Sequence, residues 1–266
     1  MTDTTPTLEI VQRSAQVAEV WLNRPAVRNA FNENVIAELR DTFERFAADT
    51  TLRAVVLSGR GKAFCAGADL SWMKEMAAYT WEQNRADAQA LADILWTIYR
   101  CPVPVVGRVH GDCYAGGVGL AAVCDVLVAA DTVTFCLSEA KLGLLPATIS
   151  PYVIRAMGEQ AARRYFVTAE RFGAAQAHAL GFVHELCAPD ALDAKVDELV
   201  GVLVANGPMA TRACKALVQD VAGLPIDAAL RAETAHRIAD IRASDEGREG
   251  LQSFLQKRKP AWLLDT

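Results

Sequence analysis

The sequence predicts an α/β fold in which mainly parallel sheets carry helices on their outside. Up to about Asp190, apolar runs typical of strands alternate with helical stretches. Two of these runs lead into glycine-rich segments where a helix can begin, Ala63 to Leu70 and Gly111 to Leu120. Because the repeated order of strand, turn and helix is typical of parallel sheets, these observations together indicate the fold class.

A hairpin and a capped helix open the predicted order of elements. Residues 8–11 and 17–22 are β-rich runs joined by a short connection near Ser14. Asn32 can cap a helix that runs to about Ala48, because its side chain can accept a hydrogen bond from the first turn. The apolar residues of this helix follow helical spacing and share one face: Val35, Ile36, Leu39, Phe43 and Phe46.

Strands and one long helix continue the pattern. A helical stretch from about Trp81 to Arg100 ends at Cys101-Pro102, since proline cannot continue a helix. Further β-rich runs are typical of buried strands, and they cover residues 53–58, 103–109, 125–130 and 132–137.

The character of the chain changes after about Asp190. Alanine-rich amphipathic stretches follow, and no strong strand candidate remains among them: 191–205, 209–221, 227–242 and 246–257. We therefore expect a core domain over 1–199 and a helical region over 200–266. So small a helical layer lacks an independent core, and it should pack on the main domain or on another subunit.

Composition excludes several classes of function. The chain has 266 residues, a net charge of −5 and 52% hydrophobic residues. This balance gives no basic surface for nucleic acid, and the short cluster Lys257-Arg258-Lys259 is typical of a solvated tail. The N-terminus lacks the pattern of a secretory signal, and no uncharged apolar run reaches about 18 residues. We expect a cytoplasmic protein without nucleic-acid or membrane partners.

The seven cysteines are odd in number and include no CxxC pair, so we expect small buried thiols in a reducing compartment. A nucleophilic Cys65 or Cys113 is an alternative, but no histidine adjoins either to act as its base. The four histidines show no ligand spacing, and we expect no metal site. His110 is interpreted as a packed residue at a strand end.

The two glycine-rich segments can supply backbone donors. In the first, the expected donor is the N–H of Ala68, and in the second it is that of Gly116 or Gly117 near a helix start. Such a pair suits an oxygen that gains negative charge during a reaction, and a helix N-terminus favours that charge. The alternative is that these glycines only make tight turns and allow close packing.

In their order and spacing, both segments resemble the crotonase superfamily, the enoyl-CoA hydratase/isomerase family. The resemblance runs nearly the full length of the chain and rests on Asn23-Arg24-Pro25, Arg28-Asn29-Ala30, Ala63 to Leu70, Gly116-Gly117, Cys124-Asp125, Glu139, Leu142 to Pro146 and Lys257 to Pro260. It implies a ClpP/crotonase-like spiral of ββα units with a helical trimerisation region at the C-terminus. It also implies homotrimers, or hexamers that are dimers of trimers.

The resemblance also implies roles for individual residues. Ala68 and Gly116 match the two amides of the family's oxyanion hole. The substrate-binding positions, which line the site or meet the coenzyme A part of the substrate, are Arg28, Ala30, Ala66, Asp69, Leu70, Gly117, Phe254 and Lys257. Asp69 is also interpreted as a helix cap, because it precedes Ser71.

The acid/base residues depart from the two-carboxylate pattern of family hydratases. Glu139 matches one of the two glutamates, whereas Gly119 stands at the position of the other. One glutamate can serve a syn hydration by shuttling a proton, and it can equally serve a double-bond isomerase. Asp112 or Tyr114 could supply a second group. Glu139 as a solvated turn residue is the remaining alternative.

The predicted function is therefore hydration of a 2-enoyl-CoA without a cofactor beyond the coenzyme A of the substrate. The alternatives are a Δ3,Δ2-enoyl-CoA isomerase and a non-catalytic crotonase-fold protein that binds acyl-CoA or RNA. The segment Phe135 to Val153 resembles a hydratase subgroup of the methylglutaconyl-CoA type, which acts on branched substrates in leucine breakdown. Its substrates carry a remote carboxylate, for which the candidate cations are Arg155, Arg163 and Arg164.

Overall fold

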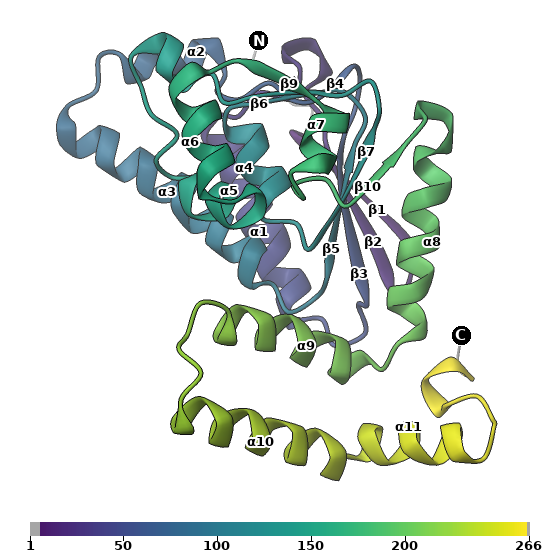
Figure 1. Cartoon of the computed structure of the whole chain (residues 1–266). Helices are drawn as coiled ribbons and strands as arrows, with labels where there is room; N and C mark the ends of the chain where they lie inside the picture. The colour runs from purple at the N-terminus through teal and green to yellow at the C-terminus, as the bar shows by residue number, and fades with distance from the viewer. Residues whose placement is uncertain (1–5, 265–266) are drawn as a thin grey trace. The chain divides into compact units, whose positions relative to one another are not determined.

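The computed structural model describes residues 6–264, and the chain divides into two compact units after Val200. The first unit contains two sheets and the helices that cover them (Figure 1). The second unit, from Gly201 onward, is helical in its described part. The predicted α/β class with mainly parallel sheets is confirmed.

The larger sheet has six strands in the order β1-β2-β3-β5-β7-β10. Strands β1 and β2 form the expected antiparallel hairpin, and every other neighbouring pair is parallel. The strands are β1 Leu8–Ser14, β2 Val17–Leu22, β3 Ala54–Gly59, β5 Val105–Val109, β7 Val126–Ala130 and β10 Glu185–Cys187. Strand β3 is buried along its whole length, as expected for a central strand with both faces covered.

The smaller sheet has four short strands in the order β4-β6-β8-β9, of which only β9 is antiparallel to its neighbour. They are β4 Ala63–Cys65, β6 Asp112–Tyr114, β8 Thr134–Cys136 and β9 Arg171–Gly173. The chain enters this sheet directly after β3, β5 and β7, and a helix follows each visit. The spiral of ββα units is therefore confirmed.

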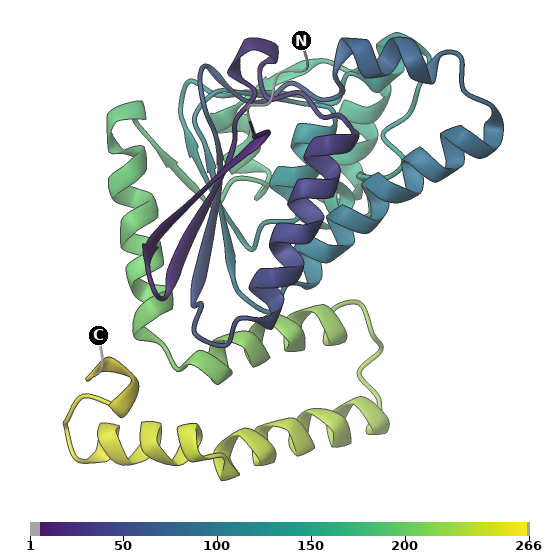
Figure 2. The same ribbon diagram turned by 180° about the vertical axis from the view of Figure 1, so that it is seen from behind.

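Helices cover both faces of the larger sheet. The first-unit helices are α1 Glu33–Ala48, α2 Leu70–Met76, α3 Trp81–Arg100, α4 Gly116–Ala122, α5 Ser150–Met157, α6 Glu159–Thr168 and α7 Ala174–Ala179, with short 3-10 turns η1 Pro25–Val27, η2 Glu139–Leu142 and η3 Pro189–Ala191. The helix α8 Leu192–Ala205 begins in the first unit and continues past the division after Val200. Figures 1 and 2 show α1 and α3 on one face of the sheet and α8 on the other. The predicted cap is present, since Asn32 Oδ1 accepts a hydrogen bond from the Val35 N–H.

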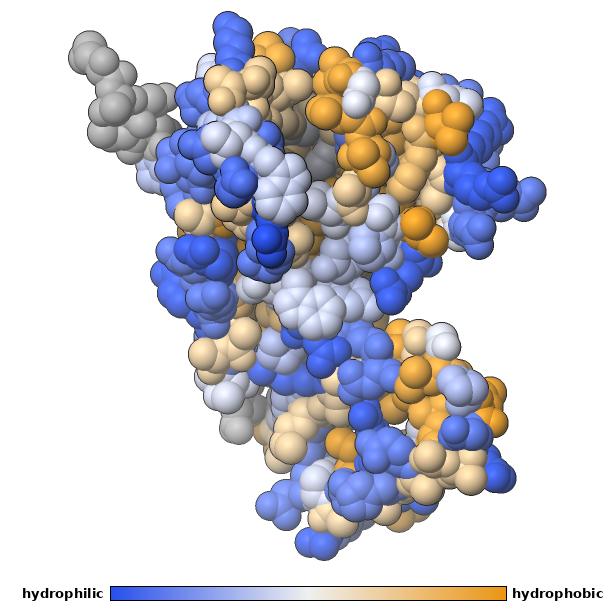
Figure 3. All heavy atoms as spheres, turned by 90° about the vertical axis from the view of Figure 1, so that its left-hand side faces the viewer, coloured by the Kyte–Doolittle hydropathy of each residue, from blue (hydrophilic) through white to orange (hydrophobic). Residues whose placement is uncertain are grey.

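The second unit is built from α9 Pro208–Val221, α10 Ala228–Ala243, α11 Asp245–Leu255 and the 3-10 turn η4 Ala261–Leu263. The Glu246 carboxylate accepts the N–H groups of Met209 and Ala210 at the start of α9, where helix donors lack partners. Large apolar side chains are exposed on this unit: Val202, Met209, Leu217, Val218, Leu224, Ile226, Ile238, Leu251, Phe254, Leu255 and Leu264. Figure 3 shows hydrophobic surface on one face of the molecule.

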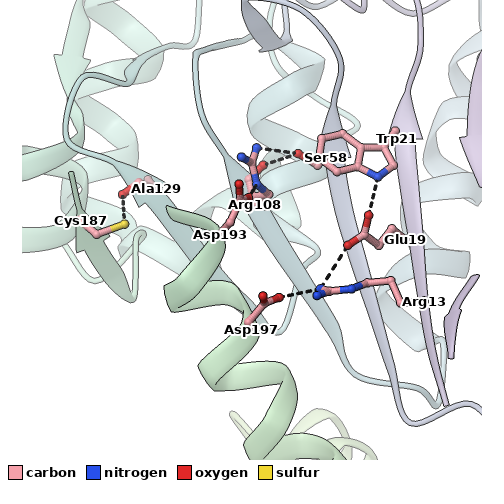
Figure 4. Close-up of polar contacts among 9 residues, drawn as sticks. All are labelled: Arg13, Glu19, Trp21, Ser58, Arg108, Ala129, Cys187, Asp193 and Asp197. Carbon is pink, nitrogen blue, oxygen red and sulfur yellow. Dashed lines mark hydrogen bonds and ion pairs between the residues drawn. The ribbon is translucent and has the colours of Figure 1, made fainter. Parts of the chain in front are cut away.

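Paired charges fix α8 to the outer face of the larger sheet (Figure 4). Arg108 Nε on β5 donates to Asp193 Oδ1 on α8 over 2.6 Å, and Arg13 Nη1 on β1 donates to Asp197 Oδ1 over 2.6 Å. Arg13 also pairs with Glu19, whose carboxylate accepts the indole N–H of Trp21. Each of these charged groups has a partner of opposite sign.

Two further findings concern the chain as a whole. None of the helices in residues 6–264 is long and apolar enough to cross a membrane. All seven cysteines are free thiols, in line with the absence of a CxxC pair.

Candidate active site

Three loops meet at one edge of the smaller sheet. Strands β4, β6 and β8 are parallel neighbours, so their carboxyl ends lie at the same edge, which is where open parallel sheets place their ligands. Ala68 follows the end of β4, Gly116 follows β6, and Glu139 follows β8. Three of the residues singled out from the sequence therefore follow the carboxyl ends of three adjacent strands.

Glycine lets the first two loops touch. A Cβ placed on Gly67 would lie 3.0 Å from the Cβ of Ala115 and 3.3 Å from the carbonyl oxygen of Tyr114. A Cβ on Gly117 would lie 2.6 Å from the carbonyl oxygen of Cys65. No side chain fits between the loops at these points, which brings the backbones that carry Ala68 and Gly116 close to each other.

Both candidate donors follow a residue in left-handed backbone conformation. Gly67, before Ala68, has φ 94°, and Ala115, before Gly116, has φ 47°. A positive φ turns the chain out of the strand direction, so the next N–H leaves the sheet ladder. Within residues 6–264, neither the Ala68 nor the Gly116 N–H donates a hydrogen bond to another protein group. Such free donors are available to an incoming oxygen.

Phe31 supports both donor loops and was missed in the sequence. Its N–H donates to the Gly67 carbonyl over 2.7 Å, and its carbonyl accepts the Asp69 N–H over 2.8 Å. Its ring is fully buried and would lie 2.8 Å from a Cβ placed on Gly116. An apolar residue directly before the helix cap Asn32 is the one sequence signal that points to a packed position here.

The positions predicted to bind substrate lie on two adjoining segments. The Arg28 carbonyl accepts the Ala66 N–H over 3.0 Å, so residues 28–31 run beside residues 66–69. Leu70 at the end of the second segment is 75% exposed, and Arg28 is exposed as well. Ala30 is buried and its carbonyl accepts from Arg24 Nη1 over 2.6 Å.

Asp69 is a cap for α2, as the alternative interpretation held. Its carboxylate accepts the Ser71 N–H over 2.8 Å and pairs with Arg24 Nη2 over 2.8 Å. Burial alone would raise the pKa of Asp69, but the hydrogen bonds from Ser71 and Arg24 outweigh burial and lower it. This carboxylate is therefore ionised and fully engaged in holding the loop.

The remaining predicted positions lie away from these segments in the sequence. Gly117 is buried in the first turn of α4, directly after Gly116. Phe254 and Lys257 belong to the second unit, where Phe254 is 80% exposed on α11 and Lys257 follows that helix with φ 53°. Their role toward coenzyme A remains a prediction.

Glu139 is a half-buried carboxyl group at the start of η2. Its Oε2 is buried and has no hydrogen-bond partner within the described residues. Burial raises the pKa of Glu139, and a hydrogen bond to its own backbone N–H only partly opposes the rise. A buried carboxyl group with a raised pKa and no partner for one oxygen is typical of a general acid or base.

No second carboxylate is placed at the Gly119 position of α4. A Cβ on Gly119 would overlap Ile149 Cγ2 and would lie 2.8 Å from Ile149 Cβ. The alternative second groups, Asp112 and Tyr114, share one face of β6, opposite to Cys113. Burial and the neighbouring Asp112 raise the pKa of Tyr114, so this phenol stays protonated.

The alternative nucleophiles do not suit thiolate chemistry. Burial raises the pKa of Cys65 to about 12 and raises that of Cys113 well above its ordinary value. His110 Nε2 lies 2.9 Å from the Gly61 carbonyl, and burial lowers the pKa of this histidine. Among residues 6–264, no three His, Cys, Asp or Glu side chains come together as a metal site would require.

Within the described residues, two backbone donors and one carboxyl oxygen without a protein partner follow adjacent strands of a ββα spiral. Donors of this kind suit an oxygen that gains negative charge during a reaction. The model of the family described as enoyl-CoA hydratase/isomerase matches residues 12–264. The chain belongs to this family, within the crotonase superfamily, and is thus an enzyme acting on acyl-CoA.

Relatives and solved structures agree with this membership. The 2,3-dehydroadipyl-CoA hydratase of Escherichia coli is 31% identical over 94% of this chain and 96% of its own. The crystal structure of an enoyl-CoA hydratase from Shewanella pealeana is 41% identical, with a TM-score of 0.93 and 96% of each chain covered. AtuE of Pseudomonas aeruginosa is 37% identical, with a TM-score of 0.92, covering 96% of this chain and 99% of its own.

Proposed function

We propose that the protein hydrates a 2-enoyl-CoA. The thioester oxygen accepts the N–H groups of Ala68 and Gly116, and Glu139 manages the proton. One observation carries this proposal. The loops after β4 and β6 have free N–H donors, and the loop after the neighbouring strand β8 holds Glu139, whose Oε2 has no partner within the described residues. Hydratase-named relatives at about a third identity support the same reaction.

The proposed reaction balances with one carboxyl group. The Glu139 carboxylate takes a proton from water as the water oxygen bonds to C3, and the electron pair of the double bond moves onto the thioester oxygen as an enolate. The two N–H groups stabilise that charge, a contribution of about 3–4 kcal/mol for each donor. The protonated Glu139 then returns the proton to C2, which regenerates the thioester and the carboxylate.

The test is a panel of enoyl-CoA thioesters followed by product mass and by the absorbance of the conjugated double bond. Hydration adds one water and removes that absorbance. Crotonyl-CoA, straight longer chains and branched chains with a remote carboxylate form the panel. Unchanged substrate across the panel, together with tight coenzyme A binding, would instead favour a non-catalytic acyl-CoA-binding protein.

A second candidate function is Δ3,Δ2-enoyl-CoA isomerisation. The observation that favours it is the lack of a second carboxylate at Gly119, where Ile149 fills the space beside the glycine. An isomerase moves one proton from C2 or C4 and returns it to the other carbon, which one glutamate can do. A 3-enoyl-CoA whose conjugated absorbance rises without any gain in mass would support this candidate.

The finer proposals are a branched substrate of the methylglutaconyl type and a trimer or hexamer. Support for the first lies in the segment that contains Glu139 and Ile149. Of its candidate cations, Arg164 pairs with Glu170, Arg155 donates to the Pro151 carbonyl, and Arg163 is exposed. The exposed apolar side chains of the second unit support self-association, which light scattering of the purified protein measures. The cytoplasmic location stays a prediction.

A further inference from the structure

We propose that Ile149 is a positioning residue that sets the distance between Glu139 and the oxyanion hole. The inference rests on the proposed function and adds a residue to its machinery. Ile149 has two structural links to these groups. It contacts the helix that carries one donor, and it ends the chain segment that begins at Glu139.

The first contact is between Ile149 and the backbone of α4 at Gly119. Gly119 lies one turn after Gly116 on the same side of the helix, because residues three apart are neighbours on a helix surface. The absence of a Cβ there lets Ile149 pack directly against the helix backbone, and the side chain is 1% exposed. Leu95 of α3 borders the same space, with its Cδ2 3.7 Å from the Cβ position of Gly119. Ile149 therefore limits how far α4 can move.

The second contact fixes Ile149 itself. It directly precedes the first residue of α5, and one turn further on Tyr152 packs against Tyr99 of α3 with ring centroids 5.3 Å apart. Tyr152 is nearly buried. An aromatic pair of this kind holds α5 on the long helix α3, so the residue at the start of α5 has a defined position.

The third link is the short segment between Glu139 and Ile149. The Glu139 carbonyl accepts the Leu144 N–H over 3.1 Å, and the Ala147 carbonyl accepts both the N–H and the hydroxyl of Ser150. These bonds shorten the segment and tie its end to the start of α5. A shift of Ile149 would thus move the Glu139 loop and α4 relative to each other.

The experiment measures two reactions of the wild-type protein and of Ile149→Val and Ile149→Ala variants. The first is hydration of the best enoyl-CoA of the panel. The second is exchange of the C2 protons of butyryl-CoA with D₂O, which needs the oxyanion hole and Glu139 but no addition of water. If the wild-type protein catalyses exchange but not hydration, the proposed function is refuted, and the exchange rates of the variants still test the role of Ile149. If the wild-type protein catalyses neither reaction, both proposals are overturned.

For Ile149→Ala we expect kcat for exchange to fall by about 10- to 100-fold, because misplacement by about 1 Å is enough for such a loss. KM should change by less than about 3-fold, since the contacts with coenzyme A are untouched. Ile149→Val should stay within about 3-fold of wild type. The control is Val196→Ala, a similarly buried aliphatic residue on α8 at the other face of the larger sheet, which should keep kcat.

A double-mutant cycle with Gly119→Ala separates positioning from general destabilisation. The new methyl group clashes with Ile149, so Gly119→Ala alone should lose activity, and Gly119→Ala/Ile149→Ala should recover part of it because the clash is removed. The inference would be overturned if the fold-loss of kcat in the double variant equals or exceeds the product of the fold-losses in the two single variants. An Ile149→Ala variant that folds with wild-type kcat would overturn it as well.

Discussion

The outer face of the larger sheet and the loop edge of the smaller sheet treat polar groups in opposite ways. Beneath α8, Arg108 pairs with Asp193 and Arg13 pairs with Asp197. At the loop edge, the Glu139 carboxyl group is left without a partner for Oε2 within the described residues. The difference teaches that the charges beneath α8 neutralise one another, whereas the unpaired oxygen of Glu139 remains available for chemistry.

Glu139→Gln is the strongest test of this contrast. The amide keeps the shape of the carboxyl group but cannot take up a proton, so turnover of the best enoyl-CoA should fall by at least about 10²-fold. The control is Glu9→Gln, which removes an exposed carboxylate paired with Arg60 and should leave the rate unchanged. Near wild-type turnover in the Glu139 variant would remove this residue from the mechanism.

Gly67→Ala tests whether the donor loops depend on their close approach. Alanine at φ 94° is strained, and its Cβ would lie 3.0 Å from that of Ala115. We expect a loss of about 1–3 kcal/mol in the free energy of unfolding. The rate should fall by about 10-fold as the Ala68 N–H is displaced. Chemical denaturation and steady-state kinetics measure the two effects, and an unchanged rate would show that the loop tolerates a side chain.

The pH dependence of stability sharpens the comparison further. Burial raises the pKa of Glu139 above its ordinary value of 4.5, so above that pH the native protein keeps a proton that the unfolded chain has lost. Its contribution to stability therefore falls as pH rises from 4.5 toward the native pKa. The Glu139→Gln variant has no such group to titrate. The difference in Tm, variant minus wild type, should therefore grow as pH rises through this range. A constant Tm difference would contradict the raised pKa.

Asp197→Asn should give the smallest effect. It breaks the pair with Arg13 on the α8 face, where both side chains are partly exposed. Exposed pairs contribute about 0–1 kcal/mol, so we expect a loss within that range and unchanged kcat and KM. A large loss of activity in this variant would erase the distinction between the two regions.

Long periodic elements could be predicted from the sequence, and short ones could not. The helices α1 and α3 were expected within a residue or two of their observed ends, because their apolar spacing and caps are local signals. The sequence predicts the residues of strands β4 and β6 only as parts of glycine-rich turns. Each has only three residues, too few to show a period, and each exists because neighbouring strands supply its hydrogen bonds.

The sequence predicts those site residues whose type itself suggests a chemical role. The glycine-rich segments and Glu139 could be named from the sequence, whereas Phe31 and Ile149 could not. Phe31 bonds to Gly67 and Ile149 fills the space beside Gly119, and both contacts join segments far apart in the chain. The neighbouring sequence of an apolar residue does not indicate which distant segment it will contact.

Because the proposed donors belong to the main chain, most substitutions at their positions do not remove them. No codon change at Ala68 or Gly116, short of one that encodes proline, deletes the N–H on which the proposed catalysis depends. Other substitutions can affect these two donors only through shape, by altering the bends at Gly67 and Ala115 that orient those hydrogens. Descendants could therefore exchange the side chain at Ala68 and retain the proposed donor, whereas the Phe31 ring leaves no room for a side chain at Gly116.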